Sequence, residues 1–396
     1  MVKVSKVKDN IYQIRIMDRE ETNFHATLYP AKDGVSYSAY LVLDEKITLI
    51  DTYEIKYHNE VKTYLDEILQ GRDIDILILQ HVEPDHSESF RKIYEMYPNI
   101  KCYCSTKGKS ELMLNFLFDY EFTPVKTGET LNTGKYTYEF FETPMVHWPD
   151  NMWSYLAEEK ILFSNDGFGQ LLTDDVLYDE EIPLEKLLAF AKEYYTNIIF
   201  PNNMAVPGVL DKFASKNWDI EIIATGHGIM LKKYIQEMYK LYDDLAHEKK
   251  DHTAVIVYET IWGNTKQEAY TIKKALENHG VQSSIYQLSE SRISEVIDDV
   301  ATASYLFLGT GNQNSCMIPI VADFVERLRS LKARKTKIAI FGAYGWNKLP
   351  FDEVIRRLED AKYTVYPTPL LTHFKESSSD VDLADAFIKD YIENLM

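Results

Sequence analysis

Cysteine is scarce in this chain of 396 residues, which contains only Cys102, Cys104 and Cys316. Thiols that are so few and odd in number provide no disulfide framework, and they indicate a reducing compartment. Three cysteines are also too few for a four-cysteine iron site. Cys102 and Cys104 alternate in a strand-like run, which places both on one face. A metal site there is an alternative, but the pattern favours two buried thiols.

Long apolar runs and an excess of positive charge are absent as well. No stretch has the length needed to span a membrane, and the first residues lack the apolar segment of a signal peptide. The formal net charge of -19 argues against nucleic acid and against an anionic membrane surface as partners. We therefore expect a cytoplasmic protein.

The length of the chain predicts two domains rather than one core. The first half alternates short strands with turns, including a hairpin at residues 38–43 and 46–51 and a buried strand at residues 74–79. Residues 230–248 have the apolar spacing of one long amphipathic helix.

Strands and helices alternate strictly after residue 251. The predicted strands are residues 254–258, 282–287, 305–308, 337–341 and 364–368, and each is followed by a helix. This order predicts a doubly wound, five-stranded parallel sheet. The expected domains are therefore residues 1–250 and residues 251–396.

Four metal-capable side chains follow the strand at residues 74–79: His81, Glu83, Asp85 and His86. Loops at strand ends commonly carry functional sites. A single histidine is usually structural, but four such side chains within six residues would each need a partner if they were buried. The loop therefore predicts a metal site.

Three further candidates also follow predicted strands, namely His147, Asp166 and His227. Each residue alone is weak evidence for a metal site, because a histidine between glycines, such as His227, can simply cap a turn. Together with the first loop they supply four imidazoles and three carboxylates. This set is sufficient for two metal ions that share one carboxylate.

The second half has three loops rich in small and polar residues at the ends of neighbouring strands, the ligand edge of a doubly wound sheet. The first precedes a helix, whose N-terminus attracts phosphate. Neither a Walker sequence nor a dinucleotide fingerprint is present. Loop Gly and Asn can simply make turns, but three loops at one edge, with aromatic rings able to stack on an isoalloxazine, favour FMN. The candidate FMN residues are Thr260, Ile261, Trp262, Gly263, Asn264, Thr265, Thr310, Gly311, Asn312, Gln313, Asn314, Ala343, Tyr344, Gly345 and Trp346.

The ligand order in the first half resembles the metallo-β-lactamase fold, in which such side chains meet at one edge of an αββα sandwich. Zinc hydrolases of that fold typically read H-x-H-x-D-H, whereas this chain has Glu83 in place of the second histidine. Mixed imidazole and carboxylate ligation suits iron better than zinc. With the flavodoxin-like second half, the whole chain resembles the flavodiiron family, in its short, two-domain form.

The resemblance implies a ligand set for each iron. His81, Glu83, His147 and Asp166 would bind one iron, and Asp85, His86, Asp166 and His227 the other, with Asp166 bridging. Either His81 or His86 could be turned away. Tyr195 and His25 are the expected residues beside the irons. This chain departs from the family in the second flavin loop, residues 309–314, where family members usually read close to G-S-P-T-x-N.

The resemblance also implies an activity and partners. The expected reaction is reduction of dioxygen to water, of nitric oxide to nitrous oxide, or of both, with rubredoxin or a reduced deazaflavin as electron donor. A helix over residues 230–248 would span roughly 28 Å and separate His227 from the flavin domain. We therefore expect a head-to-tail homodimer, with a tetramer as the alternative.

Two other functions stay open at this point. The chain could be a metal-dependent hydrolase that carries a flavodoxin domain, or a pure electron-transfer flavoprotein without a working metal site. The complete ligand set argues against the second of these.

Overall fold

The computed structural model describes the chain except for residues 25–28, 32, 117–119, 376 and 396. It divides into two compact units, Met1–Ala246 and His247–Met396. The boundary predicted near residue 251 lies just beyond this division. None of the described helices combines the length and apolarity required to cross a membrane.

Unit 1 contains two sheets packed face to face. The seven-stranded sheet has, in spatial order, β1 (Val2–Lys8), β2 (Ile11–Asp18), β5 (Val35–Val42), β6 (Thr48–Ile50), β7 (Ile76–Leu79), β8 (Lys101–Ser105) and β9 (Thr123–Val125). The five-stranded sheet has β10 (Thr130–Asn132), β11 (Thr137–Glu142), β12 (Met152–Leu156), β13 (Ile161–Asn165) and β14 (Ile222–Thr225). Their inner faces share one core that includes Val42 and Ile78 from the first sheet and Phe140, Leu156 and Phe163 from the second.

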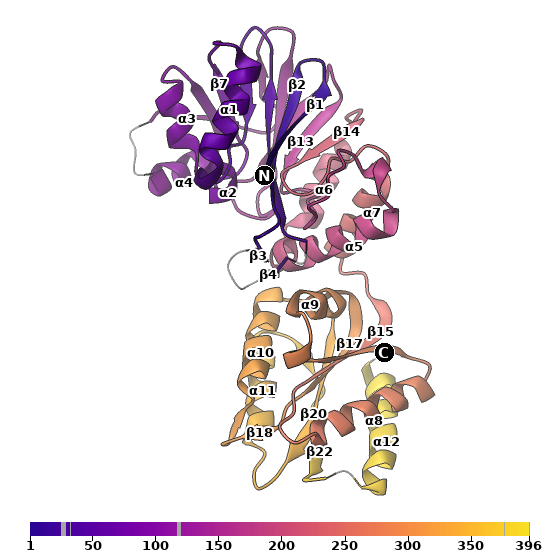
Figure 1. Ribbon diagram of the computed structural model, residues 1–396. Helices are drawn as coiled ribbons and strands as arrows, with labels where there is room; N and C mark the ends of the chain where they lie inside the picture. Colours follow the sequence, from indigo (N-terminus) through magenta and orange to yellow (C-terminus); the bar gives the residue numbers. More distant parts are fainter. Residues whose placement is uncertain (25–28, 32, 117–119, 376, 396) are drawn as a thin grey trace. The chain divides into compact units, whose positions relative to one another are not determined.

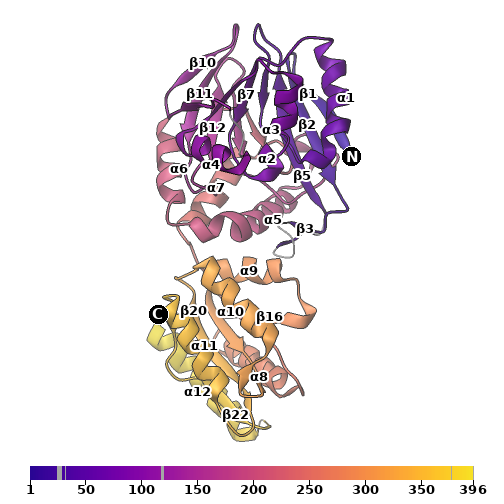
Figure 2. The ribbon, with the colours of Figure 1, turned by 90° about the vertical axis from the view of Figure 1, so that its left-hand side faces the viewer.

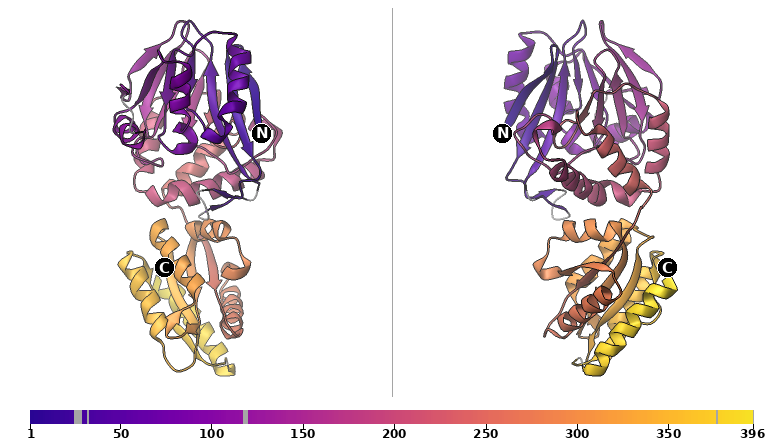
Figure 3. Two further views of the ribbon diagram at one scale, coloured as in Figure 1. Left: turned by 60° about the vertical axis from the view of Figure 1, so that its left-hand side comes forward. Right: turned by 90° about the vertical axis from the view of Figure 1, so that its right-hand side faces the viewer.

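Helices cover both outer faces of these sheets, which completes an αββα sandwich. One set is α1 (His58–Leu69), α2 (Pro84–Ser87), α3 (Phe90–Met96) and α4 (Thr106–Phe116), and the other is α5 (Leu184–Tyr194), α6 (Val206–Ser215) and α7 (Ile235–Ala246). Figures 1 and 3 show the two sets on opposite sides of the paired sheets. A short ribbon, β3 (Asn23–Phe24) with β4 (Tyr29–Pro30), stands apart from both sheets.

The pairing of the strands brings several strand ends to one edge. β6, β7 and β8 are parallel to one another, and β13 is parallel to β14. β11 and β13 are each antiparallel to β12, so they also run in the same direction. The loops that leave β7, β11, β13 and β14 at their carboxyl ends carry the predicted metal ligands.

Unit 2 is a doubly wound sheet in which every pairing along the main path is parallel. The strands are β16 (Gln282–Gln287), β15 (Asp251–Tyr258), β17 (Ala303–Gly309), β20 (Lys337–Tyr344) and β21 (Thr364–Val365), with β22 (Leu370–His373) beside β20 and a small pair of β18 (Asn312–Gln313) and β19 (Cys316–Met317). β15 from Ala254 onward and nearly all of β17 are buried because helices cover both faces of the sheet. This is the predicted doubly wound parallel sheet, except that β21 and β22 stand where one last strand was expected at residues 364–368.

The helices of unit 2 are α8 (Asn264–Asn278), α9 (Ile293–Thr302), α10 (Pro319–Leu331), α11 (Leu349–Asp360) and α12 (Ser378–Leu395). Apolar side chains of α8 and α12 pack with β15, β17 and β20 in one core, through residues such as Ile272 and Ile388. Figure 2 shows α10 and α11 side by side along the sheet. The alternation of strand and helix expected from the sequence is therefore present.

Two sequence expectations have different outcomes. Cys102 and Cys104 share the buried face of β8, as predicted, and burial raises the pKa of the Cys104 thiol to about 12.

The prediction of one helix over residues 230–248 is wrong at its start, since α7 begins at Ile235. Met230 and Leu231 are instead extended and form bridges with Tyr178 and Ile223. The helix is therefore only about 18 Å long.

Candidate functional site

The first ligand loop leaves β7 and enters α2 within a few residues. Pro84 occupies the first turn of α2, where its fixed backbone angle suits a helix start. The helix presents Asp85 and His86 inward, and Glu83 precedes it in extended conformation. All four predicted ligands of this loop are buried or nearly so, and His81 and His86 are fully inaccessible.

His81, Glu83, His147 and Asp166 form the first ligand group, and their ligand atoms all lie within 4.8 Å of one another. His147 Nε2 is 3.1 Å from both Glu83 Oε2 and Asp166 Oδ2. His81 Nε2 is 3.2 Å from Glu83 Oε2 and 3.4 Å from Asp166 Oδ2. Two imidazoles and two carboxylates thus converge on one point.

Asp85, His86 and His227 form the second ligand group, again with ligand atoms within 4.8 Å of one another. The other oxygen of Asp166, Oδ1, is 3.0 Å from His86 Nε2 and 3.2 Å from His227 Nε2. Asp166 therefore turns one oxygen to each group, which is the geometry of a bridging ligand. In this structure neither His81 nor His86 is turned away.

The donor set fits two cations. Asp85 is buried, yet neither of its oxygens accepts a hydrogen bond from the residues that the structure describes. Its Oδ2 faces only imidazole nitrogens, at 3.4 Å from both His86 and His227. A buried carboxylate without hydrogen-bond donors is costly, and a metal ion at this point would offset that cost.

The electrostatics of the cluster show strong mutual attraction. Burial alone would lower the pKa of His86, but Asp85 and Asp166 outweigh it and raise the pKa to about 9. Burial alone would raise the pKa of Asp166, but the surrounding imidazoles, His86 foremost, hold it well below its usual value. The Asp166 carboxylate is therefore ionised and available to bind cations.

Outer partners fix two of the imidazoles. His81 Nδ1 donates to Asp150 Oδ2 at 3.0 Å, and the same oxygen accepts the backbone N–H of Val82 at 2.7 Å. His227 Nδ1 donates to the carbonyl oxygen of Ser36 at 2.9 Å. Both rings are thereby turned so that Nε2 faces the cluster.

Sequence analysis did not single out Asp150 or Ser36. The only local signal for Asp150 is its place three residues after His147. Ser36 lies on β5, far from His227 along the chain, and carries no sequence signal for this contact.

A buried tyrosine lies beside the cluster, but it is Tyr194 rather than the predicted Tyr195. The Tyr194 ring centroid is 5.5 Å from that of His227, and burial together with the charge of Asp166 raises the pKa of its hydroxyl. The Tyr195 hydroxyl donates to Asn203 Oδ1 at 2.5 Å. Tyr194 ends α5 and Tyr195 begins a π-helical turn, so the two side chains point in different directions. The other predicted residue, His25, lies outside the described residues.

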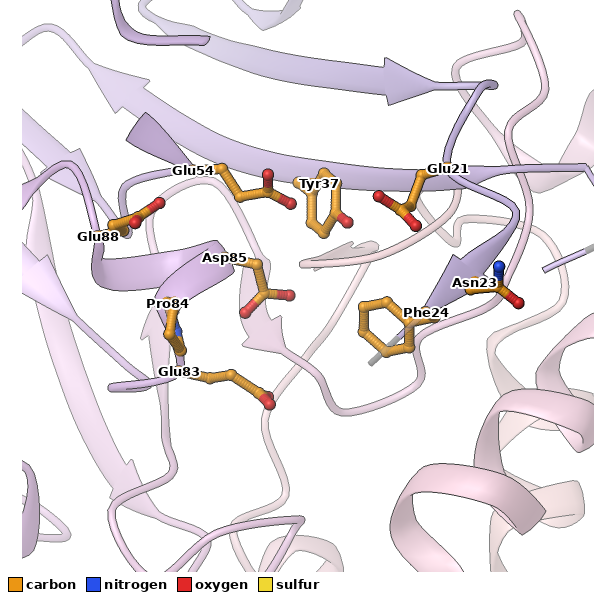
Figure 4. Close-up of a pocket in the computed structure, with 9 residues that line it drawn as sticks. All are labelled: Glu21, Asn23, Phe24, Tyr37, Glu54, Glu83, Pro84, Asp85 and Glu88. Atoms are coloured by element: carbon orange, nitrogen blue, oxygen red, sulfur yellow. The ribbon is translucent and has the colours of Figure 1, made fainter. Parts of the chain in front are cut away.

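A cavity of about 430 Å³ opens onto this cluster (Figure 4). Glu83 and Asp85 form part of its wall, so a small molecule inside it reaches the ligand groups directly. The wall consists of Glu21, Asn23, Phe24, Tyr37, Glu54, Glu83, Pro84, Asp85 and Glu88.

The three predicted flavin loops of unit 2 meet around a second cavity, of about 250 Å³. Its lining residues are Thr260, Ile261, Trp262, Asn264, Thr265, Gly311, Asn312, Ala343, Tyr344, Gly345, Trp346 and Phe374. Phe374, which follows β22, was not predicted. Four of the predicted residues, Gly263, Thr310, Gln313 and Asn314, do not line the cavity. Gly263 caps α8, and the buried Thr310 hydroxyl accepts the N–H of Ile318. Gln313 pairs with Cys316 in the β18–β19 hairpin, and Asn314 lies in its turn.

This second cavity fits a flat anionic ligand. α8 begins beside it at Asn264, and its N-cap residue Gly263 adopts φ +87°, a conformation that favours glycine. Trp262 and Trp346 are 89% and 81% exposed although both border the cavity. A bound planar ring would cover apolar surface that is otherwise in water.

Comparison with known proteins identifies the family. Residues 35–228 match the model described as the ODP family beta lactamase. The chain is 30% identical to a nitric oxide reductase of Moorella thermoacetica, over 92% of this chain and 91% of that protein. It is 31% identical to the anaerobic nitric oxide reductase flavorubredoxin of Escherichia coli, over 90% of this chain and 75% of that protein.

Solved structures agree with the sequence relatives. The rubredoxin oxygen:oxidoreductase of Desulfovibrio gigas superposes with a TM-score of 0.95 at 26% identity, over 99% of this chain and 98% of that one. The match therefore includes both the metallo-β-lactamase-like and the flavodoxin-like unit. The chain belongs to the flavodiiron family of oxidoreductases.

Proposed function

We propose that this protein reduces dioxygen to water, nitric oxide to nitrous oxide, or both, at a diiron centre in unit 1 with electrons delivered through FMN in unit 2. The observation that carries the proposal is the position of Asp166. Its two oxygens face two separate groups of imidazole and carboxylate ligands. A relative is named for nitric oxide and a similar solved structure for oxygen, which supports both substrates as candidates.

Iron is the metal that this ligand set favours. Glu83 adds an oxygen donor where zinc hydrolases of this fold carry a histidine, and harder oxygen donors stabilise ferric iron. Bound FMN and iron would carry the electrons from the external donor to the gas, which is the chemistry that side chains alone cannot provide.

The side chains of the chain have positioning and proton-holding roles. Asp166 would set the spacing of the two metal ions, while Asp150 and the Ser36 carbonyl hold the rings of His81 and His227. The raised pKa of Tyr194 keeps its hydroxyl protonated beside His227, where it can act as a hydrogen-bond donor. In unit 2, the N-terminus of α8 would hold the phosphate, and Trp262 and Trp346 would cover the flavin ring.

Metal and flavin content test this proposal first. Purified protein should contain about two irons and one FMN per chain. The anaerobically reduced protein should then be mixed separately with each gas while flavin and iron oxidation are followed. Stoichiometric zinc with little iron, and activity without a reductant, would instead establish the hydrolase alternative. FMN without metal would establish the pure electron-transfer alternative.

The electron donor is the next part of the proposal. Rubredoxin is named in the Desulfovibrio gigas structure, which makes a rubredoxin the first donor to test, with a reduced deazaflavin as the second. Comparison of the rates at which each donor reduces the FMN would rank them.

We propose that the working unit is a head-to-tail homodimer, with a tetramer as the alternative. The two candidate cofactor sites belong to separate compact units, so pairing of two chains can place one chain's flavin near the partner's irons. An Asp166→Asn variant mixed with a variant in which residues 260–265 are replaced by alanine should regain part of the activity that each lacks alone. The control is each variant mixed with itself. A fully active monomer in sedimentation and kinetics would contradict the prediction.

Iron binding should depend on pH in a defined direction. Without metal, neighbouring carboxylates raise the pKa of His86 to about 9 and that of His81 well above its usual value. Iron must displace these protons, so its affinity should increase as the pH rises from 6 towards 9. Anaerobic titration of metal-free protein with ferrous iron at several pH values measures this, together with the protons released. An affinity that is constant over this range would contradict the assignment.

A further inference from the structure

The cavity over the metal cluster is lined with more carboxylates than the two metal-binding groups use. Glu83 and Asp85 belong to those groups, but Glu21, Glu54 and Glu88 do not. We call these three residues the acidic wall. In Figure 4, Glu21 and Glu54 lie on either side of Tyr37, and Glu88 lies beyond Glu54. No Lys or Arg lines the cavity among the described residues.

One cation holds part of the acidic wall in place. Lys56 Nζ is 2.8 Å from Glu54 Oε2 and 4.0 Å from Glu21 Oε2. It is also 3.0 Å from Asp18 Oδ2, which accepts a hydrogen bond from the Tyr57 hydroxyl as well. A single positive charge is therefore shared among three carboxylates, and the surroundings of the cavity stay negative.

Glu88 is fixed in a different way. Its Oε2 accepts the backbone N–H of Ile55 at 2.9 Å, which links the residues after α2 to the segment that carries Glu54 and Lys56. The acidic wall is thus built from three separate segments of the chain. These contacts hold its carboxylates beside the cavity, although Glu88 is exposed and Glu21 and Glu54 are only partly buried.

From this arrangement we infer that the acidic wall makes the site select neutral diatomic molecules against small anions. The inference rests on the proposed diiron centre. Bound iron would neutralise Glu83, Asp85 and Asp166, whereas the acidic wall would keep its charge and repel any anion that approaches. Dioxygen and nitric oxide carry no charge, so the same wall does not hinder them.

The order of magnitude of the effect follows from Coulomb's law for charges on opposite sides of such a cavity. Two charges roughly 10 Å apart in a partly solvated cavity interact by on the order of 1 kcal/mol, equivalent to about a fivefold change in affinity. Removal of one wall charge should therefore tighten binding of an anion roughly three- to tenfold. Removal of the Lys56 charge should weaken binding by a similar factor.

Azide binding to the oxidised, iron-loaded protein tests the inference without any turnover. Azide is a small anion that binds ferric iron, and its absorbance band reports the dissociation constant directly. Glu54→Gln should bind azide more tightly than the unmodified protein, and Lys56→Gln should bind it more weakly. Lys56→Arg, which keeps the charge, should behave like the unmodified protein. Glu67→Gln, at an exposed position on α1, is the matched control for loss of a distant carboxylate.

The opposite signs separate charge from structural damage, because a merely loosened cavity would shift Glu54→Gln and Lys56→Gln in the same direction. Nitric oxide binding to the reduced protein should be unchanged in all four variants. Equal azide affinity in Glu54→Gln, Lys56→Gln and the unmodified protein would overturn the inference and leave the diiron assignment intact. A purified protein without iron would overturn the proposed function and this inference together.

Discussion

Asp166→Asn is expected to lose most of its iron and nearly all gas reduction. Asp166 Oδ1 faces His86 and His227, while Oδ2 faces His147 and His81. An amide has only one good acceptor oxygen and no charge, so both metal positions would be weakened at once. The loss should exceed the roughly 10- to 100-fold that is typical of changes outside the ligand set. Iron per chain and the rate of oxidation by each gas measure it.

Glu83→Gln is the matched comparison for this variant. Glu83 belongs only to the first ligand group, so its loss should weaken one metal position and retain the other. FMN content should be close to that of the unmodified protein in both variants, which would show that unit 2 is intact. Equal iron loss in the two variants would contradict a bridging role for Asp166.

Asp150→Asn should have the next largest effect, although Asp150 is not a proposed ligand. Its carboxylate accepts both the Nδ1–H of His81 and the backbone N–H of Val82, and so it orients the ring that begins the ligand loop. An amide in this place can present its NH₂ group to the ring and favour the wrong tautomer. Iron affinity should fall roughly 10- to 100-fold, as is common for such outer partners. Competition with a chelator measures the affinity.

Ser105→Ala provides the control for that variant. The Ser105 hydroxyl donates to the backbone carbonyl of Asp150 at 2.6 Å and does not touch its carboxylate. If His81 orientation is the cause, Ser105→Ala should keep iron affinity within a few-fold of the unmodified protein. A similar loss in Asp150→Asn and Ser105→Ala would show that only the position of the loop matters.

The convergence of the candidate ligands could be predicted because it follows from local features. Each candidate ligand comes soon after a run of strand-like residues, and parallel strands bring their carboxyl ends to one edge. His81, Glu83, Asp85 and His86 also lie close together in sequence, so their convergence needs only one loop and one helical turn.

The misplaced tyrosine and the shortened helix are errors of a different kind. Tyr194 and Tyr195 are adjacent and chemically identical, and a rotation of about 100° per residue decides which one faces His227. The apolar spacing of residues 230–248 suits one helix, but Met230 and Leu231 form extended backbone bridges instead. The bridges to Tyr178 and Ile223 outweigh local helical preference at Met230 and Leu231.

By itself, the sequence determined the two-part α/β architecture, the metal-capable residues, the flavin loops and the acidic character of the chain. These depend on the period of apolar residues and on loops at strand ends, which are local properties. Only the tertiary structure decided that Asp166 lies between two ligand groups, that Asp150 and Ser36 orient the imidazoles, and that Lys56 holds the acidic wall. Such contacts join segments that are far apart in sequence. Their geometry is fixed by how the sheets and loops pack, which no local pattern encodes.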